Sequence, residues 1–300
     1  MRSRPSEYEL VVPGTLPAVL SLLNREPGAW LPIAGGTDVM VQYGAGKLSA
    51  RKLVSIWNLR ELRHIEVSPA EIQIGAGCTF TELREHTIIN AEFPLLSSAA
   101  RWTGGIANQN RGTLGGNIVN ASPAADSLPA LLAYEAELIL VSARGERRVP
   151  YTTFHTAYRK TKLAPDELVL SICLPRQFSA YHHHTRKVGA RNAQAISKVC
   201  IAALARITNG EVEVKVNDIR IAMGSIAPIP LRLTETERII RGKSIDAKLI
   251  LSAKSAAAAE VRPIDDIRST ARYRAAVAGN LVAEFLSSLA PSIKSEPSND

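Results

Sequence analysis

The chain has 300 residues, of which 46% are hydrophobic, and a formal net charge of +8. At roughly 150 residues per domain, this length predicts about two domains with substantial cores. The longest apolar runs are shorter than the about 20 residues needed to cross a bilayer, and the opening "MRSRPSEYEL" lacks the apolar segment of a secretory signal. We therefore expect a cytoplasmic protein with no membrane span.

The positive charge is spread along the chain and not gathered in one segment. Basic residues are interspersed with acidic ones, only 5% of the residues are aromatic, and no recognition-helix or base-stacking pattern occurs. Nucleic-acid binding relies on clustered Lys and Arg against phosphates, so we expect no nucleic-acid partner. An anionic ligand or an acidic partner is compatible with the same charge.

Residues that could hold a metal or a cluster are few. Cys78, Cys173 and Cys200 lie far apart in apolar or β-type segments, so we expect packed thiols, no disulfide framework and no iron–sulfur cluster held by this chain alone. The histidines His182–His184 invite a metal interpretation. Neighbouring side chains of a strand point to opposite faces, so these three cannot converge on one ion and we expect no metal site.

The first part of the chain mixes strand and helix patterns. "YELVVPGTLPAVLSLLN" begins as a strand and passes through a Pro-Gly turn into a helix, and "WLPIAGGTDVMVQYG" predicts a strand, a glycine loop and a short helix. "KLVSIWNL", "IEVS" and "EIQIGAG" are rich in β-formers. Thr79, followed by Glu82, is a predicted helix cap. The pattern is α+β and not a regular βαβ series.

A long Gly- and Asn-rich stretch follows the helical pattern "FPLLSSAARW" and precedes a second helix near Asp126. Loops longer than about 12 residues are uncommon in compact domains unless they bind something or are disordered. The apolar Leu114, Ile118 and Val119 argue against disorder. We therefore expect a binding loop here.

The second half returns to strands and then to helices. "AELILVSARGERRVPY" predicts a hairpin with Arg144-Gly145 at its turn, and "DELVLSICLPR" a further strand. Pro175 to Ser179 is a plausible domain boundary. Beyond it we expect three strands, helices around Thr234, Asp246 and Arg272, and a disordered tail "APSIKSEPSND".

Two glycine loops, "AGGTD" and "GTLGGN", are the main candidates for ligand binding. Backbone N–H groups exposed by glycines can point together at an anion, and a helix N-terminus adds partial positive charge, so two such loops suit a pyrophosphate held from both sides. Thr37 and Thr113 would supply hydroxyl donors, whereas Asp38 is better placed as a helix cap, because two anions repel each other. For either loop taken alone, a simple turn is the favoured interpretation.

Two other nucleotide-binding patterns fail. "IQIGAGCTF" has Thr81 where a dinucleotide fingerprint needs its third glycine. "GAGKLS" has Leu48 where a P-loop needs Ser or Thr for magnesium. We expect both segments to be turns.

Four ordered motifs give the sequence a family resemblance: "LPIAGGTDVMV", "NRGTLGGNIVNASPAADSLPALL", "AYRKTKLAPDELVLSICLP" and "RKVGARNAQAISKV". They resemble the FAD-binding medium subunit of the molybdenum hydroxylases, the xanthine dehydrogenase and carbon monoxide dehydrogenase family. The resemblance covers nearly the whole chain. It implies an α+β fold with a two-lobed, PCMH-type FAD-binding domain over residues 1–176. A smaller domain over 177–289, with a three-stranded sheet and helices like that of the carbon monoxide dehydrogenase flavoprotein, and a disordered tail over 290–300 would follow.

The same resemblance assigns site residues for FAD. The glycine loops would hold the pyrophosphate, Asp126 would accept hydrogen bonds from sugar or ribityl hydroxyls, and Leu168 and Lys187 would line the flavin. The cofactor-binding residues that it implies are Leu31, Pro32, Ile33, Ala34, Gly35, Gly36, Thr37, Asp38, Gly112, Thr113, Leu114, Gly115, Gly116, Asn117, Ser122, Asp126, Leu168 and Lys187. No side chain is expected to be catalytic, because the flavin performs the redox step.

Lys187 also has a rationale in physical chemistry. Reduced flavin tends to carry negative charge near N1, and an ammonium group there would stabilise it. A solvated strand lysine is the alternative interpretation. Other positions depart from the family pattern: Ala107–Asn110 replace Gln-x-Arg-Asn, and Thr103 stands where some relatives have an aromatic residue over the flavin ring.

The resemblance implies an oxidoreductase subunit that works in electron transfer. FAD would take electrons singly from the 2Fe–2S clusters of a small partner subunit and pass pairs to NAD+, a quinone or O2. A large molybdenum-cofactor subunit would oxidise the substrate, in a dimer of heterotrimers. The alternatives are a stand-alone FAD-dependent oxidase or dehydrogenase, and a non-catalytic scaffold subunit.

Overall fold

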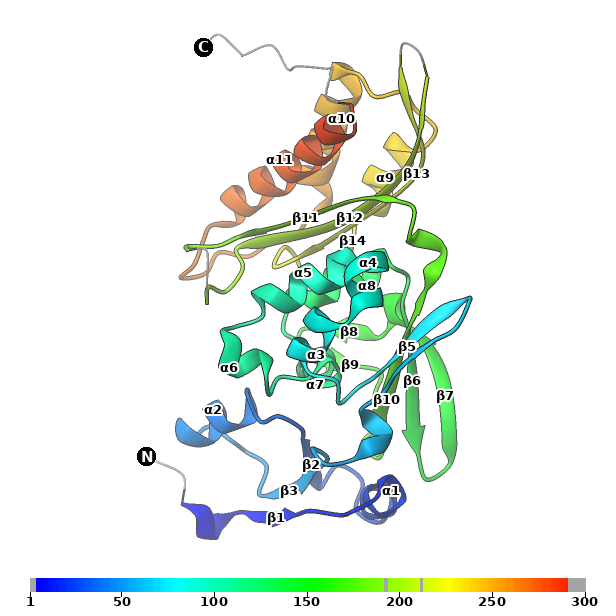
Figure 1. The fold of residues 1–300 in the computed structure, drawn as a ribbon. Helices are drawn as coiled ribbons and strands as arrows, with labels where there is room; N and C mark the ends of the chain where they lie inside the picture. Colours follow the sequence, from blue (N-terminus) through cyan, green and yellow to red (C-terminus); the bar gives the residue numbers. More distant parts are fainter. Residues whose placement is uncertain (1–3, 192–193, 211–212, 291–300) are drawn as a thin grey trace.

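A computed structural model describes residues 4–191, 194–210 and 213–290. Figure 1 shows an N-terminal lobe, a second lobe and a C-terminal domain stacked along the molecule. The α-helices in these ranges are α1 (Leu16–Arg25), α2 (Val39–Gly44), α3 (Phe80–Glu85), α4 (Thr87–Glu92), α5 (Pro94–Trp102), α6 (Ile106–Gln109), α7 (Leu114–Asn120), α8 (Ser127–Ala133), α9 (Thr234–Ile240), α10 (Ala247–Glu260) and α11 (Ala271–Leu289). The 3-10 turns are η1 (Pro5–Glu7), η2 (Arg60–Leu62), η3 (Tyr151–Thr153) and η4 (Arg176–Phe178).

The strands complete a mixed fold of helices and sheets, as expected. They are β1 (Glu9–Val11), β2 (Trp30–Ile33), β3 (Lys52–Ser55), β4 (Ile65–Val67), β5 (Glu71–Gly75), β6 (Glu137–Ser142), β7 (Gly145–Pro150), β8 (His155–Ala157), β9 (Lys160–Thr161), β10 (Leu168–Pro175), β11 (His182–Val188), β12 (Val199–Asn209), β13 (Val214–Gly224) and β14 (Leu231–Arg232).

The N-terminal lobe is built on a parallel sheet in the order β1-β3-β2. Helix α1 begins at a Thr15 cap, whose side-chain oxygen accepts a hydrogen bond from the Ala18 N–H. Its apolar face packs with Trp30 and Val54 of the sheet, and the same cluster includes Leu168 of the second lobe. The two lobes therefore share a buried apolar contact.

The second lobe is an antiparallel sheet in the order β4-β5-β10-β6-β7. One large cluster joins the inward residues of this sheet to helices α3, α4, α5, α7 and α8. The predicted cap of α3 is confirmed, since Thr79 and Glu82 form a capping box. The segment around Gly75, the failed dinucleotide pattern, is a tight structural turn: a Cβ on Gly75 would lie 2.3 Å from the Leu62 carbonyl oxygen.

The Gly- and Asn-rich stretch differs from the single long loop predicted. It contains two short helices, α6 and α7. Helix α7 forms because Thr113 accepts a hydrogen bond from the Gly116 N–H at its start, and because Leu114 and Ile118 are fully buried on one face. Packing of this face outweighs the low helix propensity of the glycines.

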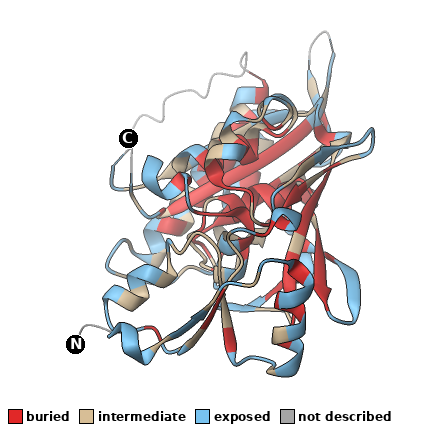
Figure 2. Cartoon of the chain, turned by 60° about the horizontal axis from the view of Figure 1, so that its bottom comes forward, coloured by how far each residue is buried: buried red, intermediate tan, exposed pale blue. Residues whose placement is uncertain are grey.

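The C-terminal domain has one strand more than predicted. Its sheet has the order β11-β12-β13-β14, and the two-residue β14 was too short to give a sequence signal. The helices predicted around Thr234, Asp246 and Arg272 are present as α9, α10 and α11. Figure 2 shows the buried residues gathered where the sheets meet their covering helices. Ala290, where the predicted tail begins, is buried, and residues 291–300 lie outside the described residues.

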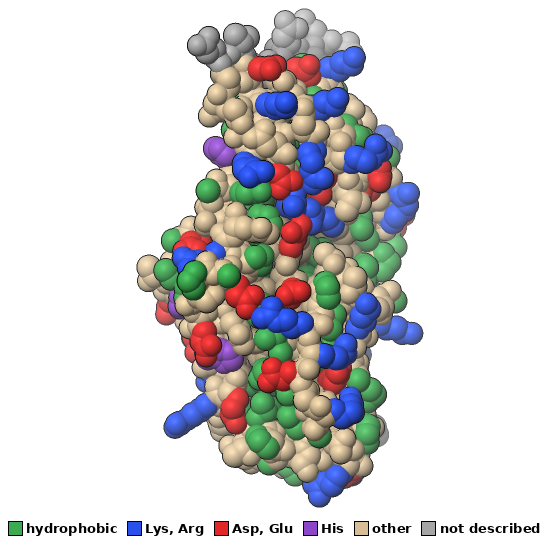
Figure 3. Space-filling view, turned by 90° about the vertical axis from the view of Figure 1, so that its right-hand side faces the viewer, with side chains coloured by type: hydrophobic (Ala, Val, Ile, Leu, Met, Phe, Trp, Pro, Cys, Tyr) green, Lys and Arg blue, Asp and Glu red, His purple; other side chains and the backbone are tan. Residues whose placement is uncertain are grey.

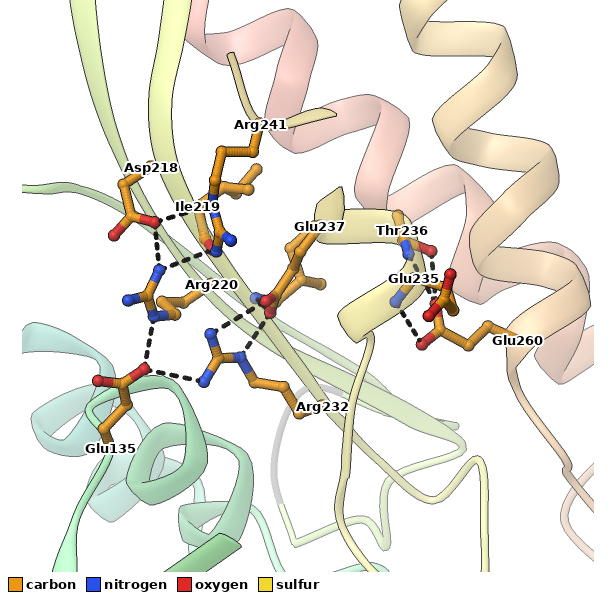
Figure 4. Close-up of polar contacts among 11 residues, drawn as sticks. Glu135, Asp218, Ile219, Arg220, Arg232, Glu235, Thr236, Glu237, Arg241 and Glu260 are labelled. Carbon is orange, nitrogen blue, oxygen red and sulfur yellow. Dashed lines mark hydrogen bonds and ion pairs between the residues drawn. The ribbon is translucent and has the colours of Figure 1, made fainter. Parts of the chain in front are cut away.

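A partly buried ion network joins the second lobe to the C-terminal sheet (Figure 4). Glu135, which follows α8, accepts hydrogen bonds from Arg220 at 2.7 Å and from Arg232 at 3.3 Å. Arg232 also binds both carboxylate oxygens of Glu237, which is 4% exposed and accepts the Ile221 N–H at 2.7 Å. Arg232 thus bridges a carboxylate of each domain.

The surface and the cysteines fit the composition. Figure 3 shows Lys and Arg interspersed with Asp and Glu over the face it presents. Cys78, Cys173 and Cys200 are free and buried, and burial raises the thiol pKa of Cys78 to about 12 and that of Cys173 to about 11. Within the described ranges, no helix combines the length and apolarity that crossing a bilayer requires.

We predict that Arg232→Met lowers the free energy of unfolding by about 3 kcal/mol at pH 8, because it leaves the buried Glu237 carboxylate without its cation. Burial raises the pKa of Glu237 and Arg232 opposes that rise. In the variant the folded-state pKa lies still further above the unfolded one, so stability recovers as the pH falls and the carboxyl is protonated. Denaturant unfolding at pH 5 and pH 8 measures both effects.

Arg238→Met is the matched control, because Arg238 pairs with Glu235 on the surface, where the two side chains are 72% and 64% exposed. It should cost less than about 1 kcal/mol at either pH. Equal losses in the two variants would contradict the role assigned to the buried bridge.

Candidate functional site

The two predicted glycine loops are in direct backbone contact. A Cβ built on Gly35 would lie 1.5 Å from the Arg111 carbonyl oxygen, which belongs to the residue before Gly112. Only glycine permits this approach, because any side chain at position 35 would overlap the second loop. The structure therefore brings together the two segments that the sequence singled out.

The first loop presents donors that the protein does not use. Among the described residues, no protein acceptor is found for the backbone N–H groups of Gly35, Gly36, Thr37 and Asp38. Gly36 has a left-handed φ of +76°, which turns the backbone between β2 and α2. Consecutive free amides in such a turn form a cradle suited to an anion such as a phosphate.

The second loop does not present free amides, although the sequence predicted that both loops would direct amides at an anion. The N–H groups of Gly112 and of Leu114, Gly115, Gly116 and Asn117 all donate to protein acceptors, among them the Cys78 and Ala76 carbonyls. They hold α7 against the second lobe. In this conformation the second loop therefore contributes shape and side chains to the site, and its amides are largely committed to the fold.

Asp38 is not the side-chain cap that the sequence predicted. It stands at the N-cap position of α2, but its backbone is already helical (φ −100°, ψ −46°) and its side chain caps no N–H. A capping side chain needs an extended backbone to turn back over the first turn of the helix. The Asp38 carboxylate instead accepts a hydrogen bond from Gln42 at 2.5 Å.

A cleft of about 870 Å³ lies between the second lobe and the C-terminal domain. This size is typical of sites for small molecules and cofactors. Five of the predicted site residues line it: Asp38, Asn117, Ser122, Asp126 and Lys187. Leu31–Thr37 and Gly112–Gly116 are not among its lining residues.

Leu168 lies elsewhere. It is 4% exposed and packs in the apolar cluster beneath α1, so it does not line the cleft. Its place is set by the strand, because the side chain points to the face of β10 that the N-terminal lobe covers. The flavin contact that the resemblance implies for Leu168 therefore stays a prediction.

Asp126 and Lys187 form a buried ion pair in this cleft. The Lys187 ammonium lies 2.6 Å from Asp126 Oδ2 and also donates to the Trp102 carbonyl at 3.1 Å, and the Ser197 hydroxyl donates to Asp126 Oδ1. The side chains are 11% and 7% exposed for Lys187 and Asp126. Burial raises the pKa of the Asp126 carboxyl, while Lys187 and Ser197 oppose that rise. The wall of the cleft therefore carries a neutral ion pair, in which the Lys187 charge is compensated by Asp126, and not an isolated cation.

Comparison with known proteins identifies the family. Residues 6–177 match the FAD binding domain in molybdopterin dehydrogenase. The chain belongs to this family. Residues 184–289 match the CO dehydrogenase flavoprotein C-terminal domain. The two matches together cover most of this chain.

Individual relatives agree with this assignment. The chain is 33% identical over 262 residues to the xanthine dehydrogenase FAD-binding subunit of Escherichia coli O157:H7, covering 87% of this chain and 88% of the relative. It is 27% identical over 282 residues to the carbon monoxide dehydrogenase medium chain of Hydrogenophaga pseudoflava, covering 94% and 96%. A solved structure of carbon monoxide dehydrogenase from that organism superposes with a TM-score of 0.88 at 28% identity, over 94% of this chain and 96% of the other.

Family membership makes FAD the cofactor of this oxidoreductase subunit and explains the geometry. FAD carries a diphosphate, and the unpaired amides at Gly35–Asp38 form the kind of cradle that a diphosphate requires. The cleft beside them has room and polar groups for the remainder of the cofactor. The residues present therefore fit the group.

Several cleft residues were not singled out as site residues from the sequence, although Ser197 lies within the motif "RKVGARNAQAISKV". Ser197, Ser225 and Arg274 line the cleft from the C-terminal domain, more than seventy residues from the glycine loops. A lone serine or arginine in a strand or helix pattern is indistinguishable from a surface or packing residue until the chain is folded. The part of the chain that the structure describes contains no group of three or more His, Cys, Asp or Glu placed to hold a metal.

We predict that Gly35→Ala weakens FAD binding more than tenfold, because the added methyl group forces the two loops apart. Gly44→Ala is the control, since nothing lies within 4 Å of a Cβ at that position. Fluorescence titration of the purified variants with FAD measures the dissociation constants, and thermal unfolding reports on the fold. Equal affinity in the two variants would show that the contact does not shape the binding site.

Proposed function

We propose that this chain is the FAD-carrying electron-transfer subunit of a molybdenum hydroxylase complex. It would take electrons from the 2Fe–2S clusters of a small partner subunit and pass them to an external acceptor, NAD+, a quinone or O2. The observation that carries the proposal is the backbone contact of Gly35 with Arg111 in a chain of this family, beside four amides that have no acceptor in the part of the chain that the structure describes.

The protein's own residues would hold and tune the cofactor. Bound FAD supplies the redox chemistry of the subunit. The Gly35–Asp38 amides would bind the diphosphate, and Asp126 would accept hydrogen bonds from sugar or ribityl hydroxyls. Lys187 lies beside Asp126 at the wall of the cleft, where its charge can act on the flavin through low-dielectric protein.

The partners follow from what this chain lacks and from what its relatives are called. All three cysteines are buried and far apart, so an iron–sulfur cluster would have to belong to another subunit. The relative from Hydrogenophaga pseudoflava is named a medium chain. We therefore propose a small 2Fe–2S subunit and a large molybdenum-cofactor subunit as partners, in a cytoplasmic dimer of heterotrimers, with domains over 1–176 and 177–289.

Purification from the native host tests this proposal. The chain should co-purify with two further subunits, one of them cysteine-rich, and should show a flavin absorbance spectrum. The isolated FAD-loaded chain should not be bleached by the substrate of the complex until the partners are added back. Bleaching of the isolated chain would favour a stand-alone oxidase, and a colourless chain after FAD addition would favour a scaffold.

The Asp126–Lys187 pair gives a prediction with two opposite signs. Lys187→Met removes the cation and should lower the flavin midpoint potential by about 30 mV or more, which for a two-electron couple corresponds to about 1.4 kcal/mol. Asp126→Asn leaves the cation without its counter-charge and should raise the potential, while FAD binding weakens. Redox titration of the FAD-loaded variants measures both.

Lys248→Met serves as the control, because Lys248 is exposed on α10. The flavin midpoint potential of this variant should equal that of the unaltered protein. If Lys187→Met and Asp126→Asn shift the potential in the same direction, or not at all, the pair does not act on the flavin electrostatically.

A further inference from the structure

Ser225 has an unusual backbone conformation at the end of β13. Its φ is +67°, in the left-handed region that residues other than glycine seldom adopt. Its N–H donates to the Pro123 carbonyl at 2.8 Å, its carbonyl accepts from Arg274 at 2.8 Å, and its hydroxyl donates to the Ser197 carbonyl at 3.0 Å. These bonds together hold the conformation and tie three separate segments to one residue.

Arg274 is fixed at the opposite end of this network. It is 4% exposed, and its second guanidinium nitrogen donates to Asp266 Oδ1 at 2.7 Å. Burial tends to raise the pKa of Asp266, but the Arg268 amide, Arg274 and the Ser269 amide hold that pKa at about 2. The carboxylate is therefore charged at all working pH values, and Arg274 keeps its counter-ion while it binds Ser225.

Ser197 carries the network to the ion pair in the cleft. Its carbonyl is held by Ser225, and its hydroxyl donates to Asp126 Oδ1, while Lys187 occupies Oδ2. Pro123, whose carbonyl binds the Ser225 amide, lies three residues before Asp126. Ser225 therefore holds the carboxylate from two sides, through the Ser197 loop and through the segment that leads to Asp126.

We propose that Ser197 is a positioning residue for FAD binding, and that Ser225 and Arg274 hold it in place from the C-terminal domain. The inference rests on the proposed function and deepens it. Ser197 donates to Asp126 Oδ1 and so orients the carboxylate, and all these side chains line the cleft. The C-terminal domain thereby sets the affinity for a cofactor whose diphosphate is bound by the N-terminal lobe.

Two substitutions remove single links with little change to the fold. Ser225→Gly keeps a residue that accepts a left-handed φ and retains the N–H and carbonyl bonds, but it deletes the hydroxyl that holds Ser197. Ser197→Ala deletes the hydroxyl that binds Asp126. Each should raise the FAD dissociation constant about tenfold, as expected for losing a hydrogen bond that orients a charged group.

Arg274 tests the far end of the network. Arg274→Met should weaken FAD binding by a similar factor, and Arg274→Lys should restore part of it, because an ammonium group can still donate to the Ser225 carbonyl. Ser252→Ala and Arg272→Met are the matched controls, since both residues are exposed, on α10 and on α11. Thermal unfolding of the FAD-free variants reports whether each still folds.

The experiment is FAD titration of the full chain by flavin fluorescence, with the midpoint potential of each loaded variant as a second measurement. Weaker FAD binding in Ser225→Gly and Ser197→Ala, with unfolding temperatures close to those of the controls, supports the inference. If both variants bind FAD as tightly as Ser252→Ala, the inference is overturned and the proposed function stands. If the unaltered chain binds no FAD, the proposed function itself fails.

Discussion

The site depends on one close approach between two backbones. Gly35 lies against the Arg111 carbonyl with no space for a side chain, and this contact seats the turn between β2 and α2 on the start of α7. Gly36 turns the chain at the same point, and within the described ranges the amides of Gly35 to Asp38 have no protein acceptor. These amides lie at partly or fully exposed positions at the start of α2, so they are open to an acceptor from outside the protein. We propose that the diphosphate of FAD is this acceptor.

The two loops divide the work unequally. The first loop presents amides that have no acceptor among the described residues. The amides of the second loop donate hydrogen bonds that hold α7 in place, and the first loop packs against the backbone of the second. The rest of the site comes from both sides of the cleft, with Asp126 supplied by the second lobe and Lys187, Ser197 and Ser225 by the C-terminal domain. The salt-bridge network of Figure 4 links Glu135, which follows α8, to Arg220 and Arg232 of the C-terminal sheet, so it joins the two domains.

Much of the fold could be read from the sequence because most elements have strong local signals. The Thr79 capping box, the hairpin at Gly145 and the amphipathic α1 are examples, since each depends on residues close together in the chain. The elements that were missed depend on tertiary contacts. Helix α7 is stabilised by burial of Leu114 and Ile118, and β14 by pairing with β13. The Thr113 cap is a local signal for α7, but the glycines that follow it oppose a helix prediction, and the two-residue β14 has no local signal.

The site could be predicted in part, for the same reason. Glycines mark positions where the backbone needs an unusual conformation or a close approach, so the sequence could single out both loops. The family motifs singled out Asp126 and Lys187, which line the cleft. The side chains that surround this pair, such as Ser197, are ordinary residues whose role depends on where the fold places them. Asp38 and Leu168 show the converse: a capping residue type and a motif position were recognised, but the backbone angle of one and the burial of the other decide what each side chain contacts.

The most direct measurement is a crystal structure of this chain with FAD. The account predicts diphosphate oxygens within hydrogen-bond distance of the Gly35–Asp38 amides, with Gly35 still packed on the Arg111 carbonyl. A diphosphate bound elsewhere, or loops that have separated around it, would contradict the account.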